Sequence, residues 1–217
     1  GCVGMFLLGS VFSVQFGMSA VYGAASGLSL PQISAFVAMF YVGATFSQYP
    51  IGWISDRMDR RLLILIVAGI GGVGGVLGMM MGNYFSVLLV AAVLVGATSN
   101  PLYSLLIAYT NDFLEHENMA AASGGLVFIN GLGAIAGPMI AGWLMQVIGP
   151  PGYFIEIAVL LFAVMIYAAW RMTQRAAPAV TTTGSYAPVS PSASIVAVEY
   201  AQEYAIDAAQ EDDREND

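Results

Sequence analysis

Apolar side chains run almost unbroken through most of the chain, and charged residues interrupt them at only a few places. No charged side chain occurs in residues 1–55, 62–111, 118–155 or 157–170. Each of the three longer runs exceeds the roughly 20 apolar residues that cross a bilayer core. The runs are continuous rather than alternating, which favours membrane-spanning helices over the strands of a barrel. The pattern therefore predicts an all-α polytopic membrane protein.

Each of these long runs also contains an internal turn signal that divides it in two. Residues 27–31 (Gly-Leu-Ser-Leu-Pro) interrupt the first run, Gly82 and Asn83 the second, and residues 149–152 (Gly-Pro-Pro-Gly) the third. We therefore expect a six-helix transmembrane bundle over residues 1–171. The expected spans are residues 2–24, 32–54, 62–82, 84–110, 119–147 and 152–171.

Charges alternate from one predicted turn to the next. The turns near 27–31, 82–84 and 149–152 are uncharged, whereas residues 55–61, 111–118 and 171–175 carry charges. Successive spans alternate sides of a membrane, so the charged turns share one side, and that side holds five of the six arginines. Cytoplasmic loops are enriched in Arg and Lys. We therefore expect this side, and with it both ends of the bundle, to face the cytoplasm.

The end of the chain has a different composition. Residues 1–175 have a net charge of −1, while residues 176–217 contain eight acids and one arginine, a net charge of −7. A Ser-, Thr-, Ala- and Pro-rich segment followed by acids cannot bury enough apolar surface to fold alone. We expect residues 172–217 to form a disordered acidic cytoplasmic tail.

Composition also excludes several classes of function. The chain has 9% charged residues and no lysine, so it has no basic stripe for nucleic acid. Cys2 is the only cysteine, and no nucleophile–base set or metal-ligand spacing is present. The Gly-rich run 69–78 lacks a following Lys-Ser/Thr and predicts helix packing rather than phosphate binding. We expect no enzyme activity, no metal and no cofactor, and we expect His116 in its charged loop to be solvated.

The loop after the second span carries the most specific motif. A solvated loop at the cytoplasmic face explains its arginines but not a glycine four residues before an acid. A glycine lets a neighbouring helix approach closely, and the acid can pair with Arg60 or face the positive end of another helix. These residues are expected to act as a conformational latch: Gly52, Asp56, Arg57, Arg60 and Arg61.

This loop resembles the signature loop of the major facilitator superfamily, G-x-x-x-D-R-x-x-R-R, and every one of those letters is met. Asp59 stands where the family usually has Gly, a variant often seen in the corresponding loop of the second six-helix half. The fifth span resembles the family's G-x-x-x-G-P-x-x-x-G helix, and either close packing or gating would explain its pattern. The residues concerned are Gly133, Gly137, Pro138 and Gly142.

The resemblance covers roughly residues 1–175 and extends to the tenth and eleventh helices of uncharacterised bacterial members. It implies the carboxyl-terminal half of a twelve-helix major facilitator fold in a bacterial inner membrane, with an upstream six-helix half as partner. A chain that opens inside a span looks like a fragment or a separately encoded half.

The resemblance further implies secondary active transport of a small solute by alternating access, with a site near the midplane between two halves. Two alternatives remain open: a non-transporting scaffold or sensor built on the same bundle, and an inactive truncated fragment. A water-filled cavity would favour transport over a scaffold.

Polar side chains inside the predicted spans are candidates for the cavity, because such groups usually face a bundle interior. For each, a helix–helix hydrogen bond is the alternative. Tyr22 is expected to be an interfacial aromatic residue. Glu156, the only acid inside a span, is either a proton site or a residue that reaches the outer interface. The candidate cavity residues are Gln15, Tyr41, Thr45, Gln48, Asn100, Tyr103 and Asn130.

Overall fold

The computed structural model describes residues 1–111 and 119–174, and no strand occurs among them. The first span is interrupted, because a short π-helix and a break separate α1 from α2. In chain order the elements are α1 (Cys2–Phe12), the π-helix η1 (Ser13–Gly17), α2 (Ser19–Ala25), α3 (Leu30–Ser55), α4 (Arg60–Met81), α5 (Phe85–Asn111), α6 (Met119–Ile148) and α7 (Pro151–Gln174).

Five of the described helices are long and apolar enough to cross a membrane, and the bent pair of residues 2–17 and 19–25 makes a sixth if its two parts form one broken span. The all-α bundle of membrane-spanning helices is thereby confirmed. The two parts of the first span meet at an angle of 51°, and this bend was not predicted.

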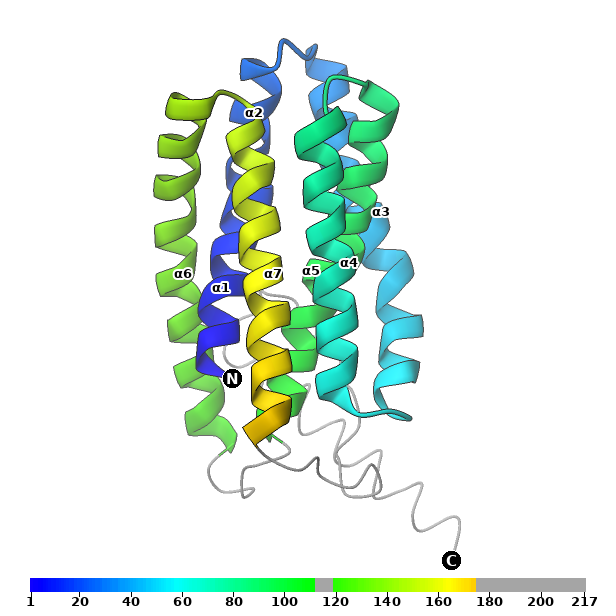
Figure 1. The fold of residues 1–217 in the computed structure, drawn as a ribbon, viewed down its shortest axis with the longest axis vertical. Helices are drawn as coiled ribbons and strands as arrows, with labels where there is room; N and C mark the ends of the chain where they lie inside the picture. Colours follow the sequence, from blue (N-terminus) through cyan, green and yellow to red (C-terminus); the bar gives the residue numbers. More distant parts are fainter. Residues whose placement is uncertain (112–118, 175–217) are drawn as a thin grey trace, which may run out of the picture.

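The helices stand side by side, with their connections at two ends (Figure 1). The turns that follow α2, α4 and α6 lie at the upper end, while the α3–α4 turn and the end of α7 lie at the lower end. Helices α4 and α7 form the front of the bundle, and α3 and α6 lie at its two edges. The most extensive helix contacts are α3 with α5, α4 with α7, α4 with α5, and α1 with α6.

Local sequence signals explain where the helices begin and end. Helix α3 begins with a capping box between Ser29 and Gln32. Helix α4 is N-capped by Asp59, whose side chain accepts a hydrogen bond from the Arg61 amide at 2.9 Å. The turns after α2 and α6 contain Gly27 and Gly149, with φ of 73° and 83°, a region that favours glycine.

Two pairs of helices touch backbone to backbone through glycines. In the α1·α6 seam, a Cβ added at Gly9 would overlap the carbonyl oxygen of Asn130, and one at Gly133 would overlap that of Phe6. In the α3·α5 seam, the same holds for Gly43 against Val93 and for Gly96 against Phe40. Close approach of this kind strengthens the van der Waals contact that associates helices in lipid.

The Gly-rich run of α4 also packs helices, as the sequence predicted. A Cβ at Gly75 would lie 2.9 Å from the Ala158 backbone nitrogen, and one at Gly78 would meet the Phe154 ring at 2.5 Å. On another face of α4, Gly74 approaches Leu94 of α5. Helix α4 therefore packs against both α5 and α7 through glycines.

Tyr22 is buried among aromatic rings inside the bundle. It is 3% exposed, and its ring stacks on Tyr153 with the centroids 4.8 Å apart. Phe36 of α3 and Phe154 of α7 also contact this ring, at 5.6 Å and 5.2 Å. The sequence did not predict this burial, because the position of Tyr22 near a span end does not reveal that α2 packs against α3 and α7.

We expect Gly133→Ala to lower the thermal stability of the purified protein, because the added methyl group must displace the α1 backbone. Overpacking of this kind costs about 1–3 kcal/mol. Gly131→Ala is the matched control, since nothing lies within 4 Å of its Cβ position and alanine is the better helix former. Equal melting temperatures for the two variants in detergent would contradict the seam.

Candidate functional site

Polar side chains gather where the first span changes from α1 to α2. Gln15 of η1 is fully buried, and its Oε1 accepts a hydrogen bond from Ser99 Oγ of α5 at 2.8 Å. Its main-chain oxygen accepts hydrogen bonds from Tyr153 Oη at 3.0 Å and from Ser19 Oγ. Gln15 thus joins the first span to α5 and α7 at once.

Three nitrogen or oxygen atoms of η1 and the middle of α5 are buried without a hydrogen-bond partner among the described residues. They are Gln15 Nε2, Asn100 Nδ2 and Tyr103 Oη. Most buried polar groups in proteins are hydrogen-bonded, so unpartnered ones need an explanation. We call Gln15, Ser99, Asn100 and Tyr103 the midspan polar cluster.

Aromatic rings lie beside this cluster and connect the first span to α3. Phe16 contacts Tyr41 with ring centroids 4.8 Å apart and Phe40 at 6.0 Å. Phe12 contacts Phe16 at 6.1 Å and meets Tyr103 edge to face at 6.3 Å. We call Phe12, Phe16, Phe40 and Tyr41 the aromatic bridge.

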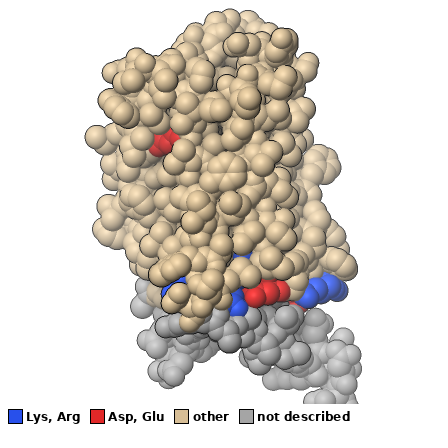
Figure 2. Space-filling view, in the orientation of Figure 1, with Lys and Arg blue, Asp and Glu red and all other residues tan. Residues whose placement is uncertain are grey.

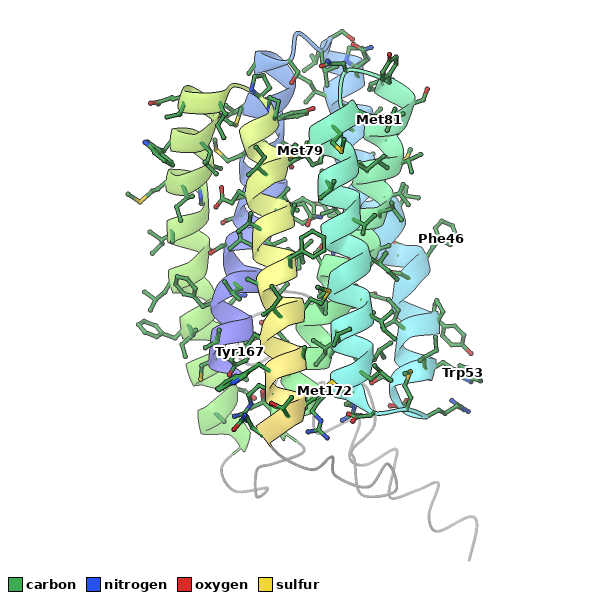
Figure 3. The ribbon with its side chains drawn as sticks, in the orientation of Figure 1. Phe46, Trp53, Met79, Met81, Tyr167 and Met172 are labelled. Atoms are coloured by element: carbon green, nitrogen blue, oxygen red, sulfur yellow. The ribbon has the colours of Figure 1, made fainter. Side chains whose placement is uncertain are left out.

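The α3 candidates lie on one face, and that face is open in this chain. Tyr41 is 57% exposed, Thr45 is exposed and Gln48 is half-buried. Tyr41 therefore reaches the aromatic bridge while keeping much of its ring uncovered. On other faces of α3, Phe46 and Trp53 point away from the bundle (Figure 3).

Asn130 lies apart from the midspan polar cluster. Its Nδ2 donates to the main-chain oxygen of Met5 at 3.2 Å, within the α1·α6 seam. Ser10 Oγ strengthens the same seam by donating to the Gly133 oxygen at 2.9 Å. The geometry fits the helix–helix hydrogen bond that the sequence left open as an alternative for Asn130.

The other small residues of α6 divide into two groups. A Cβ at Gly137 would lie 3.0 Å from the Ser10 Cα, so Gly137 extends the α1·α6 seam. Gly142 does not extend it, because a Cβ there would have only Met18 Cε nearby, at 3.9 Å. Pro138 lies inside α6 and is half-buried.

Glu156 is a buried acid in α7. It is 3% exposed, and neither carboxylate oxygen has a partner among the described residues. This burial argues against a position at the outer interface. Figure 2 shows the charged side chains gathered at the lower end of the bundle, with one separate acidic patch in the upper half.

The loop after α3 holds its predicted ion pair. Arg60 Nη2 lies 3.5 Å from Asp56 Oδ1, and its Nε donates to Ser55 Oγ at 3.2 Å. Arg57 lies over the Trp53 ring, 4.1 Å from the centroid. Gly52 is buried. The other expected partner of Asp56, the positive end of a helix, would be the start of α6 around residues 118–121, whose side chains lie outside the described ones.

Asp59 has a role that the motif alone did not indicate. Besides capping α4, it pairs with Arg61, whose Nε lies 3.3 Å from Asp59 Oδ1. An Asp directly before an apolar helical run is a recognisable N-cap signal. Ser99, Tyr153 and Phe16 had no such signal, because serines and aromatic residues are common in membrane spans.

No group of three or more His, Cys, Asp or Glu side chains that could hold a metal ion occurs in the part of the chain that the structure describes. Cys2 is exposed. His116 and the acids around it lie outside the described residues.

Comparisons with known proteins identify the family. An uncharacterised MFS-type transporter of Bacillus subtilis, YfkF, is 29% identical over 162 residues, covering 69% of this chain and 38% of that protein. The uncharacterised MFS-type transporter YcaD of Escherichia coli O9:H4 is 26% identical over 166 residues, covering 76% of this chain and 42% of that protein. The chain thus spans about two-fifths of the length of these relatives.

A solved structure supports the fold alone, since its identity is 17%. It is an auto-inhibited peptide transporter of the POT family, with a TM-score of 0.62 over 89% of this chain and 39% of that one. The family model of the Major Facilitator Superfamily matches residues 1–201. The chain therefore belongs to the Major Facilitator Superfamily.

Proposed function

We propose that this chain forms one six-helix half of a secondary active transporter, which moves a small solute across the membrane by alternating access. The observation that carries the proposal is the set of polar atoms without partners at midspan, in Gln15, Asn100 and Tyr103. A bundle that only holds itself together in lipid gains nothing from such groups, whereas a transport pathway needs them.

The chain is proposed to be the carboxyl-terminal half, and an upstream six-helix half to be its partner. Asp59 in the loop motif supports this assignment. The edge helices α3 and α6 also leave surface for a partner. Only 22% and 28% of the residues in their most apolar stretches are buried, against 50% in α4, α5 and α7. The partner half would pack on the face opposite α4 and α7 and supply the other wall of the pathway.

The bundle is proposed to lie in a bacterial inner membrane with its lower end in the cytoplasm. The described arginines Arg57, Arg60, Arg61 and Arg171 are in the α3–α4 turn, the first turn of α4 and the end of α7, all at this lower end. The positive-inside rule then sets the orientation. The acidic tail beyond residue 174 lies outside the described residues and stays a prediction.

A labelling experiment separates a transporter from a dry scaffold or an inactive fragment. In a Cys2→Ser background, Thr45→Cys should react with a membrane-impermeant thiol reagent, because a pathway supplies water to this face. Ile70→Cys, on the α4 surface and 45% exposed, should face lipid and stay unreactive. Labelling rates in membranes from both sides provide the measurement; an unreactive Thr45→Cys would remove the support for a pathway.

The same background tests orientation. Met58→Cys, in the α3–α4 turn, should be labelled in inverted vesicles and protected in intact cells. Labelling of Met58→Cys from outside in intact cells would contradict the cytoplasmic assignment of the lower end.

The Asp56–Arg60 pair is proposed to be a latch for the outward-facing state, together with Gly52, Arg57 and Arg61. Asp56 is 40% exposed, and exposed pairs contribute about 0.2–1 kcal/mol. A two-state equilibrium needs little more, because about 1.4 kcal/mol changes a population ratio tenfold.

Asp56→Asn should shift the protein toward the inward-facing form, since it keeps the shape and removes the charge. We expect Thr45→Cys labelling to rise from the cytoplasmic side and fall from the outer side by roughly 1.5- to 5-fold. Asp56→Glu is the matched control, because it keeps the negative charge at the same position. Unchanged labelling in Asp56→Asn would leave the loop with a role in topology alone.

Glu156 is proposed to be a proton site. An ionised carboxylate that is buried without a partner is strongly disfavoured, and acids inside membranes usually serve ion or proton movement. Its position in α7 also puts it one helical turn from Tyr153, which holds the Gln15 carbonyl.

Glu156→Gln should abolish the pH dependence of the conformational equilibrium, while Glu156→Asp should retain it. The measurement is the ratio of Thr45→Cys labelling from the two sides between pH 5.5 and 8, relative to Met58→Cys at each pH. The ratio should change severalfold in the parent protein and stay constant in Glu156→Gln. A Gln variant with the parent's pH profile would exclude Glu156 as the proton site.

A further inference from the structure

The midspan polar cluster and the aromatic bridge together indicate the kind of solute that this half recognises. We infer that it takes an uncharged solute, with a hydrogen-bond acceptor such as a carbonyl or hydroxyl oxygen on an aromatic or apolar body. This inference rests on the proposed transport function and narrows it to a substrate class.

The acceptor follows from the chemistry of the unpartnered atoms. Gln15 Nε2 and Asn100 Nδ2 are amide nitrogens, which can only donate hydrogen bonds, and Tyr103 Oη carries a donor as well. The Gln15 acceptor, Oε1, is already bound by Ser99 Oγ. These donors therefore need a hydrogen-bond acceptor that the described residues do not supply.

The absence of charge follows from the surroundings of the cluster. Among the described residues, the charged side chains other than Glu156 lie in the turn between α3 and α4, at the start of α4 and at the end of α7. A charged group removed from water needs a partner of opposite sign. On η1, on the α3 face of Tyr41 and around Asn100, this half offers hydrogen bonds and rings. Glu156, in α7, is buried without a partner, which disfavours its ionised form, so it supplies no fixed charge to pair with.

The aromatic body follows from the bridge. Phe16 is half-buried and Tyr41 is 57% exposed, so both retain ring surface after contacting each other. A planar or apolar body can pack on this surface in stacked or edge-to-face geometry. Phe12 meets Tyr103 edge to face, and Gln15 lies on η1 together with Phe16, so the rings adjoin two of the three donor residues.

The backbone beside the site can move to admit a solute. The three donor atoms are buried in the present conformation, so access requires a shift of the first span. Gln15 lies inside the π-helix, and the 51° break follows at Met18. Short π-helices frequently mark functional sites, and helix bends concentrate where the hydrogen-bond ladder is interrupted.

Three probes with the same ring test the inference: phenylacetamide, phenylacetate and phenethylammonium. Each probe is added to membranes that contain the full-length transporter. Its single cysteine is Thr45→Cys, which lies one helical turn from Tyr41. Phenylacetamide should slow alkylation of this cysteine at millimolar concentration, and the two charged probes should not. Equal protection by either charged probe, or none by phenylacetamide, overturns the inference.

Tyr103→Phe tests the cluster directly. The concentration of phenylacetamide that gives half protection should rise roughly 2- to 10-fold, as for the loss of one hydrogen bond. The melting temperature should not fall, because the removed hydroxyl has no partner in the described structure. Tyr84→Phe, in a residue 66% exposed at the start of α5, is the matched control. A fall in stability without a change in protection would assign Tyr103 to packing and overturn its role here.

The two proposals fail in different ways. If Thr45→Cys never reacts, the pathway itself is wrong. If it reacts but phenylacetamide does not protect it, transport stands and only the substrate class is refuted.

Discussion

Backbone contact through glycine is the constraint on which this bundle depends. In lipid, burying apolar side chains between helices gives little advantage over exposing them to acyl chains, so close packing must hold the helices together. Each seam uses the same reciprocal device: one glycine from each helix faces a carbonyl of the other, Gly9 with Gly133 and Gly43 with Gly96. The seams make α1 with α6, and α3 with α5, two close-packed pairs.

The two pairs also reveal an internal relation. If α1, α3 and α4 correspond to α5, α6 and α7, the α1·α6 seam maps onto the α5·α3 seam, and the α4·α7 contact maps onto itself. The corresponding helices α3 and α6 both contain an internal proline, Pro50 and Pro138. Three-helix repeats of this kind are known within each half of transporters of this family. The relation is broken at η1, because α5 has no π-helix.

The number of spans and their ends, within a few residues, could be predicted from the sequence because run length and turn residues act locally. The spacing of Gly133 and Gly137 left close packing and gating both open, and their contacts with α1 are those of close packing. The partners could not be predicted, since periodicity does not tell which helices are neighbours. The Gln15–Ser99 bond, the burial of Tyr22 and the seam contact of Asn130 all depend on that choice. The π-helix could not be predicted either, because residues 13–17 have the same apolar pattern as an ordinary membrane helix.

The π-helix has a consequence for the phase of the first span. A wider turn holds one more residue than an α-turn, which rotates everything beyond it by about 100°. Before η1, Gly9 and Ser10 of α1 face α6; after it, Tyr22 of α2 contacts Phe36 of α3. The first span therefore contacts α6 through α1 and α3 through α2. Removal of a single residue from η1 would rotate α2 relative to α1, so the first span could keep its contacts with α6 or with α3 but not both. The length of this segment is therefore as constrained as its composition.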